Sequence, residues 1–200
     1  ISLASAFFET VSGFTTTGAT VLVGIDSLPR SINFYRLELH WLGGMGIIVL
    51  AVAILPMLGI GGMQLYKAEA PGPVKDAKLT PRITETARLL WYVYLATTLL
   101  GIGLFLLGGM SWFDAVCHSF SAISTGGFST HDSNFGYFNS SYLDYAASLI
   151  MFMGGVNFAL HFAALHTRNI KIYWADSEFR LYIFIMLLVT LICTIVLTQH

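Results

Sequence analysis

Long apolar stretches separated by short polar segments dominate this chain. A helix needs about 20 mostly apolar residues to cross the hydrocarbon core of a membrane. Four stretches have about this length, at residues 39–58, 89–107, 143–165 and 181–197. Hydrophobic residues make up 56% of the chain, charged residues 10%, and the mean hydropathy is +0.71. Soluble domains carry about 25% charged residues, so we predict an all-α integral membrane protein with these four transmembrane helices.

Two further apolar stretches, residues 3–14 and 112–123, are too short to cross a membrane. Stretches of 10 to 14 apolar residues are typical of core helices or of re-entrant segments. Each of these two is followed by Thr or Ser and then Gly. Non-helical backbone is tolerated at membrane depth only inside protein or beside a water-filled path. We therefore predict two re-entrant pore helices, each ending in a turn beside a pathway.

The cations are distributed unevenly along the chain and predict its orientation. Eight of the ten lie in the connections between the first two spans and between the last two: Lys67, Lys75, Lys78, Arg82, Arg88, Arg168, Lys171 and Arg180. By the positive-inside rule both connections are cytoplasmic. The segment 108–142 contains no Lys or Arg and is therefore predicted to lie on the outer side.

Net charge and cysteine content exclude several other classes. The formal charge is −1, so no basic field is present to bind nucleic acid. Cys117 and Cys193 both lie in apolar stretches. Two thiols supply neither a disulfide scaffold nor a four-ligand zinc site, and we interpret them as small hydrophobic residues.

An internal repeat relates the two short apolar segments. The sequence from Phe14 to Ala19 is similar to that from Ala122 to Gly127 at an offset of 108, which places Gly18 on Gly126. The pair Gly43-Gly44 corresponds to Gly154-Gly155 at an offset of 111. Two elements in the same order indicate a repeated unit of span, pore helix, turn and span.

The Thr-Gly turns have the chemistry of a cation site. Glycine adopts positive φ without steric cost, so the carbonyl groups near Gly18 and Gly126 can face a common axis. Rings of carbonyl oxygens replace the water of a dehydrated monovalent cation, and Thr or Ser hydroxyls add further oxygens. The negative end of each short helix favours a cation at the same place. The alternative is that Thr and Gly simply cap a buried helix.

Polar side chains inside the spans are a second group of candidates. They are Glu38, His40, Asn157 and His161. His40 is predicted to lie at the membrane interface, in preference to a role in a site. Asn157 and His161 are four apart on one helical face and either face the pore or bond a neighbouring helix, and the structural role is favoured. Four acidic residues are predicted either to attract cations to the outer mouth or to form an ordinary solvated face: Glu9, Asp26, Asp132 and Asp144.

Two functions from other classes compete with ion transport. A haem-binding electron carrier would use His40 and His161 as axial ligands, but it leaves the repeat unexplained. An intramembrane hydrolase would use a Thr or Ser with His161 as base. No G-x-S-x-G sequence is present, and no carboxylate accompanies His161 to orient its ring. The sequence therefore favours a transporter over an enzyme.

At these residues the sequence resembles the Trk/Ktr/HKT superfamily of potassium transporters, and within it the bacterial TrkH type. Residues 8–20 are similar to the first pore helix and filter of that family, and residues 118–129 to the second. The resemblance implies four span–pore-helix–span repeats of the potassium-channel-like type around one pathway. It implies K⁺ uptake, by a channel or by symport, with K⁺ as the transported ion and no organic cofactor.

The resemblance also assigns residues to the filter. It implies that the K⁺ sites are lined by Thr16, Thr17, Gly18, Ser124, Thr125 and Gly126, with Ala19 and Gly127 beside them. Two filter loops cannot encircle an ion, so two further repeats are expected outside this chain. The expected organisation is a first pore repeat at 1–66, a cytoplasmic linker at 67–88, a second repeat at 89–166, a linker at 167–180, and the first span of a truncated third repeat at 181–200.

The expected setting is the bacterial inner membrane, crossed several times. The resemblance implies contact with membrane lipid, a homodimer, and a cytoplasmic ring of nucleotide-binding regulatory subunits of the TrkA type.

Overall fold

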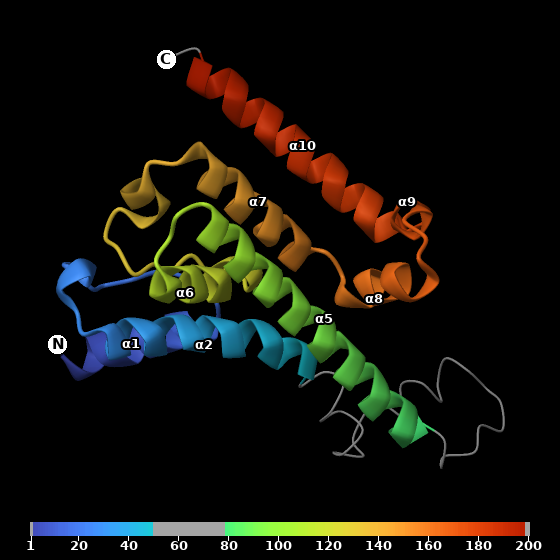
Figure 1. Ribbon diagram of the computed structural model, residues 1–200, viewed down its shortest axis with the longest axis horizontal. Coiled ribbons are helices and arrows are strands. Elements are labelled where there is room, and N and C mark those ends of the chain that lie inside the picture. Colours follow the sequence, from blue (N-terminus) through green and yellow to red (C-terminus); the bar gives the residue numbers. More distant parts are fainter. Residues whose placement is uncertain (1, 50–78, 199–200) are drawn as a thin grey trace. The chain divides into compact units, whose positions relative to one another are not determined.

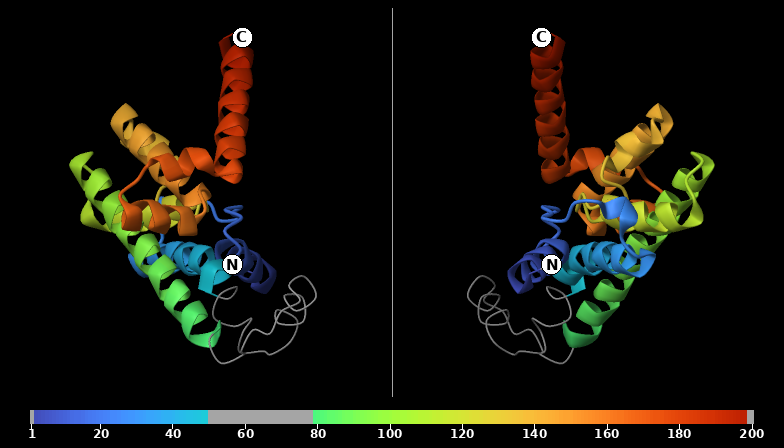
Figure 2. Two further views of the ribbon diagram at one scale, coloured as in Figure 1. Left: turned by 90° about the vertical axis from the view of Figure 1, so that its right-hand side faces the viewer. Right: turned by 90° about the vertical axis from the view of Figure 1, so that its left-hand side faces the viewer.

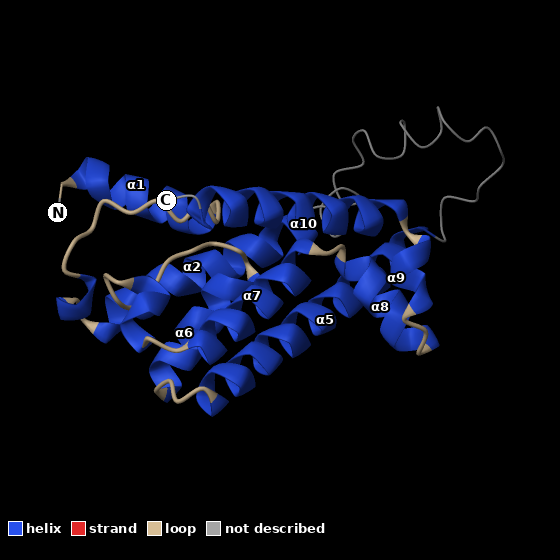
Figure 3. Cartoon of the chain, turned by 90° about the horizontal axis from the view of Figure 1, so that it is seen from above, coloured by secondary structure: helices blue, strands red, loops and turns tan. Residues whose placement is uncertain are grey.

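The computed structural model describes residues 2–49 and 79–198, and all regular secondary structure in them is helical (Figures 1 and 3). The predicted all-α membrane class is confirmed. The described residues belong to two compact units, Ile1–Gly155 and Val156–His200. The helices of the first unit are α1 (Leu3–Phe14), the 3₁₀ turn η1 (Ile25–Ser27), α2 (Arg30–Val49), α5 (Leu79–Leu107), α6 (Trp112–Ile123), the 3₁₀ turn η4 (Asn134–Phe138) and α7 (Ser141–Gly155).

Helix α6 lies at the centre of the first unit. It packs against α2, α5 and α7, while α1 packs along α2 (Figure 1). Most of its residues from Ala115 onward are buried. Cys117 forms a core cluster with Leu37 and Phe128. This short helix is therefore enclosed by longer ones.

The two predicted pore helices begin in the same way. Helix α1 starts after Ser2, whose hydroxyl accepts the backbone N–H of Ser5 at 3.1 Å. Helix α6 starts after Ser111, which accepts the N–H of Asp114 at 3.2 Å. A serine N-cap satisfies one of the unpaired donors of the first turn, and both helices are 12 residues long.

Two of the four predicted spans are confirmed as single helices. The stretch Arg88–Leu107 of α5 and the helix α10 (Ser177–Thr198) are long and apolar enough to cross a membrane. Helix α2 begins at Arg30 and not near residue 39, and is described to Val49. The rest of that predicted span, residues 50–58, lies outside the described residues.

The prediction of one continuous helix over residues 143–165 is wrong. Helix α7 ends at Gly155 and α8 (Phe158–Thr167) begins after Asn157. Glycine is a poor helix former, and the Asn157 side chain accepts the N–H of Ala159 at 3.0 Å as an N-cap. Asn157 thus has a structural role, as predicted, but it caps a new helix and does not lie within a continuous one.

The predicted linkers are partly helical where they are described. Residues 79–88 of the 67–88 linker belong to α5, and residues 67–78 lie outside the described part of the chain, as do residues 50–66 of the first repeat. The 167–180 linker contains the short helix α9 (Lys171–Ala175) and the start of α10.

The second unit consists of α8, α9 and α10. Nδ1 of His161 lies 2.8 Å from the hydroxyl of Tyr173, which ties α8 to α9. Helix α10 is one straight helix (Figure 2), and none of its apolar residues is buried. Such an all-round apolar surface is typical of a helix that contacts lipid or further membrane helices.

Candidate functional site

Each pore helix ends in a turn with the same backbone geometry. After α1, the N–H of Thr16 donates to Gly13 O at 3.1 Å, and Thr16 has φ 55°. After α6, the N–H of Thr125 donates to Ala122 O at 3.1 Å, and Thr125 has φ 52°. Positive φ is uncommon for a threonine, so its recurrence shows that the two turns are structural equivalents.

This equivalence corrects the predicted register by one residue. The helix bounds and the positive φ values relate the repeats at an offset of 109, so the offset of 108 is wrong. Gly18, with φ 75°, corresponds to Gly127, with φ 95°, and Thr17 corresponds to Gly126. The sequence comparison had matched Gly18 to the first glycine of a pair, whereas the backbone conformation that favours glycine belongs to the second.

The two turns meet directly. A Cβ atom on Gly18 would overlap the carbonyl oxygen of Gly126 and lie 3.0 Å from its carbonyl carbon. Residues 108 positions apart in the chain therefore have touching backbones. This is the close approach that two segments lining one path require.

The glycine pairs of the repeat occupy equivalent places. A Cβ atom on Gly43 in α2 would overlap the carbonyl oxygen of Phe14, the last residue of α1. A Cβ atom on Gly154 in α7 would overlap the carbonyl oxygen of Ile123, the last residue of α6. In each repeat a glycine of the following helix thus accommodates the C-terminal end of the pore helix.

The hydroxyl groups predicted as ion ligands are engaged with their own turns. The Ser124 hydroxyl donates to Phe120 O at 2.8 Å, and that of Thr125 donates to Ser124 O at 2.7 Å. The Thr17 hydroxyl lies 2.8 Å from that of Thr15. Ser124 corresponds to Thr15, which bonds Val11 O in the same way, so Ser124 lies at the helix end. The turns share backbone carbonyls, and a hydroxyl that donates its hydrogen keeps lone pairs that can also face a cation.

Behind each turn a buried serine holds the segment. Ser12 in α1 donates its hydroxyl hydrogen to Ala19 O at 2.6 Å. Ser121, its equivalent in α6, accepts the N–H of Gly127 at 3.0 Å. Both serines are buried, and sequence inspection did not single them out.

His40 lies against the second turn, so its predicted interfacial position is wrong. The side chain is fully buried, and its ring stacks on Phe128 with centroids 4.2 Å apart. Its Nδ1 atom lies 3.5 Å from the Ser121 hydroxyl. A Cβ atom on Gly126 would overlap this ring. His40 therefore forms the wall directly behind Gly126.

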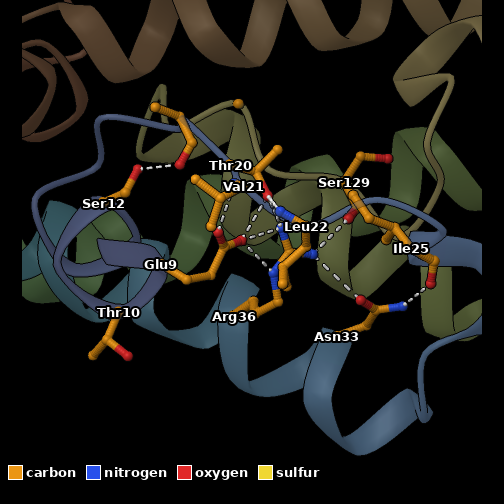
Figure 4. Close-up of polar contacts among 12 residues, drawn as sticks. Glu9, Thr10, Ser12, Thr20, Val21, Leu22, Ile25, Asn33, Arg36 and Ser129 are labelled. Carbon is orange, nitrogen blue, oxygen red and sulfur yellow. Dashed lines mark hydrogen bonds and ion pairs between the residues drawn. The ribbon is translucent and has the colours of Figure 1, made fainter. Parts of the chain in front are cut away.

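Glu9 is also placed differently from the prediction. Its carboxylate is buried and pairs with Arg36 of α2, with Nη2 to Oε1 at 2.6 Å (Figure 4). It also accepts the hydroxyl of Thr20 at 2.8 Å and the N–H of Val21 at 3.2 Å. Glu9 therefore anchors the segment after the first turn and is not an acid of the outer mouth.

The second repeat uses a histidine at the equivalent position. His118 corresponds to Glu9 at the offset of 109 and is fully buried. Its Nε2 atom lies 3.0 Å from the hydroxyl of Ser129, and its Nδ1 atom lies 2.9 Å from Asp114 O. Ser129 in turn corresponds to Thr20, so each pore helix holds the segment after its own turn.

Hydrogen bonds join the outer loops of the two repeats. Asp26 contacts Nδ1 of His131 and accepts the N–H of Asp132 at 3.0 Å. The Asp132 carboxylate accepts the N–H of Gly24 at 3.0 Å. Hydrogen bonds from His131 and Asp132 lower the pKa of Asp26 to about 2. Asp26 and Asp132 thus connect loops, while Asp144 is exposed in the first turn of α7.

These features define an all-α membrane protein in which two short helices end at adjoining turns. The chain matches the family described as TrkH, cation transport protein, over residues 1–200. The chain belongs to the TrkH family of cation transport proteins.

Relatives and a solved structure agree with this assignment. The chain is 57% identical over 202 residues to the Trk system potassium uptake protein TrkH of Vibrio parahaemolyticus, and 53% identical over 200 residues to that of Escherichia coli K12. The matches cover 100% of this chain and 42% and 41% of the relatives. The crystal structure of the potassium transporter TrkH from Vibrio parahaemolyticus matches with a TM-score of 0.84 and 50% identity, over 100% of this chain and 40% of that chain.

The chain therefore spans about two-fifths of the length of these relatives. Its family is a transporter family. The alternative of a haem carrier using His40 and His161 finds no support in any of these comparisons.

Proposed function

We propose that this chain forms two of the pore repeats of a potassium uptake protein in the bacterial inner membrane. K⁺ enters from the outer side and passes the carbonyl groups of the two adjoining turns. The proposed lining is Thr16, Thr17 and Gly18 in the first turn, and Thr125, Gly126 and Gly127 in the second, with Ser124 and Ala19 at their borders.

The observation that carries this proposal is the contact between Gly18 and Gly126 O. Two non-helical segments come together at the C-terminal ends of two short helices, where backbone carbonyls and helix dipoles both favour a cation. A simple helix cap explains a glycine after each helix. It does not explain why the two caps adjoin each other.

The remaining parts of the proposal concern the complete protein. The relatives that are named potassium uptake proteins are more than twice as long as this chain, which supports two further repeats that complete the ring. We extend the proposal to a homodimer with a TrkA-type nucleotide-binding ring on the cytoplasmic side, because the relatives are named as parts of a Trk system.

The test is ⁸⁶Rb⁺ and K⁺ uptake into liposomes that contain the full-length protein carrying this chain. Gly18→Ala forces a side chain onto Gly126 O at a position with φ 75°, so uptake or its preference for K⁺ over Na⁺ should be lost. The matched control is Gly109→Ala. Gly109 has φ 91° but nothing lies within 4 Å of its Cβ position. Alanine there introduces the same backbone strain as in Gly18→Ala but no clash with the other turn.

Uptake by wild type and by Gly109→Ala, together with loss in Gly18→Ala, is the expected result. Absence of K⁺ or Rb⁺ flux in the wild type would overturn the proposed function. Unchanged flux and ion preference in Gly18→Ala would overturn the filter assignment.

A further inference from the structure

Arg36 is a buried cation in the middle of the first unit. Its side chain is 3% exposed, and it extends from α2 toward both turns (Figure 4). Burying a guanidinium is unfavourable unless it is paired and fully hydrogen-bonded. Its pairing with Glu9 satisfies this, with Nε and Nη2 lying 2.9 and 2.6 Å from Oε1.

The same guanidinium reaches the segments that follow both turns. Its Nη2 donates to the Thr20 hydroxyl at 3.3 Å, and its Nη1 donates to Ser129 O at 3.4 Å. Thr20 and Ser129 are equivalent residues of the two repeats, each two positions beyond the glycine with positive φ. Arg36 thus connects matching points of the two segments.

Two further contacts fix the orientation of the guanidinium plane. Nη1 donates to the Asn33 side-chain oxygen at 3.3 Å, and Asn33 donates in turn to Ile25 O at 3.1 Å. The guanidinium carbon lies 4.4 Å above the ring centroid of Phe128, the residue before Ser129. A planar group held by hydrogen bonds at its edge and an aromatic ring at its face has little freedom to rotate.

The second repeat has no equivalent side chain at this position. The glycine pairs relate α2 to α7 at an offset of 111. At this offset the residue equivalent to Arg36 is Ala147. The equivalent of Glu9 is His118, whose two ring nitrogens contact Asp114 O and the Ser129 hydroxyl, both in its own repeat. One arginine therefore serves both segments.

We propose that Arg36 is a positioning residue that sets the spacing between the two filter segments and thereby the preference of the pore for K⁺ over smaller cations. This inference rests on the proposed function of the two turns. A buried ion pair adds little net stability compared with apolar residues of the same volume, and its best attested role is to fix register. Carbonyls discriminate between alkali cations through their number and spacing, and Arg36 holds that spacing from behind.

The experiment measures the ratio of K⁺ to Na⁺ flux in liposomes for the full-length protein and its Arg36→Met variant. We expect the ratio to fall by roughly 2- to 30-fold, the range of couplings transmitted through packed and hydrogen-bonded neighbours. Arg36→Lys keeps the charge but loses the planar set of N–H donors of the guanidinium, so its ratio of K⁺ to Na⁺ flux should also fall. The control is Arg30→Met, which removes an exposed cation from the first residue of the same helix.

Thr20→Val is the milder variant, because it keeps the buried ion pair and removes the Arg36 contact with the first segment at an exposed position. It also removes the bonds of this hydroxyl to Glu9 and to the N–H of Leu22. It tests the proposal even where Arg36→Met does not fold, and a smaller fall in the ratio is expected. A wild-type ratio in folded Arg36→Met, or in both Arg36→Lys and Thr20→Val, would overturn the inference. The guanidinium carbon of Arg30 lies 5.5 Å from the ring centroid of Phe113 in α6, so an equal fall in Arg30→Met would also overturn the inference, because the effect would then not be specific to the buried Arg36. A wild type without K⁺ flux would instead overturn the proposed function.

Discussion

Ser12 and Ser121 occupy the same place behind the two turns but use their hydroxyl groups in opposite ways. Ser12 donates to the carbonyl of Ala19 at 2.6 Å, whereas Ser121 accepts from the amide of Gly127 at 3.0 Å. The two segments therefore present different backbone groups to their pore helices. The repeats share a backbone path and differ in the hydrogen bonds that secure it.

Removing either serine hydroxyl should weaken its own segment. Ser12→Ala leaves a carbonyl without its partner and Ser121→Ala leaves an amide without one, at a cost of about 0.5–1.5 kcal/mol each, because Ala19 and Gly127 are exposed and water can reach their backbone groups. We expect lower thermal stability in detergent and a reduced K⁺ preference in liposomes. Ser148→Ala, which removes an exposed hydroxyl bonded within α7, should change neither quantity. Equal melting temperatures for all three variants would contradict this prediction.

Gly43→Ala should destabilise the protein because the new methyl group meets the carbonyl oxygen of Phe14. Overpacking of this kind costs about 1–3 kcal/mol. Gly46→Ala in the same helix meets nothing within 4 Å and should gain about 0.5–1 kcal/mol from helix propensity. Thermal unfolding followed by intrinsic fluorescence distinguishes the two. A Gly43→Ala variant as stable as Gly46→Ala would mean that α1 and α2 separate easily.

Truncation of His40 should disturb the second turn. The fully buried ring fills the space between Gly126 and Phe128, and His40→Ala leaves a cavity whose cost is about 3 kcal/mol by comparison with other ring truncations. We expect a lower ⁸⁶Rb⁺ uptake rate per folded molecule. His166→Ala, at an exposed position of α8, is the control. Full uptake by His40→Ala would show that the ring does not support Gly126.

The link between the outer loops should weaken in acid. The folded-state pKa of Asp26 is about 2, below its ordinary value of 3.8. A lowered carboxyl pKa adds stability that is complete above the ordinary value and is lost as the pH falls toward the lowered one. Asp26→Asn should therefore be less stable than wild type at pH 7, and the difference should shrink between pH 4 and pH 2. Melting temperatures across this range test it, and a difference independent of pH would contradict it.

The sequence predicted the helical class and the two short helices because their signals are local. Apolar length marks α5 and α10, and short apolar stretches with Thr-Gly endings mark α1 and α6. The long span at 143–165 was predicted wrongly because apolar composition does not reveal that Asn157 caps a new helix. Hydropathy measures transfer into the membrane and not backbone continuity.

The site was less accessible to prediction because its supports come from distant residues. Nothing local distinguishes His40 behind Gly126 from a histidine at the membrane interface. Arg36 was not predicted as a site residue, although an arginine within an apolar helix is itself a signal of a functional position. The register of the repeat was predicted from residue identities alone, whereas the φ angles show which glycine of the second repeat is equivalent to Gly18.

The Arg36 guanidinium contacts both repeats and therefore restricts which substitutions they can accept in evolution. Two copies of a duplicated unit ordinarily drift apart, each tolerating its own substitutions. Here a change at Phe128 alters the surroundings of a side chain that belongs to the other copy, because the Arg36 guanidinium lies over its ring. A change at Glu9 reaches the same ring through Arg36. Substitutions around Arg36 in one repeat are thus expected to require compensating substitutions in the other, so that the two repeats evolve together.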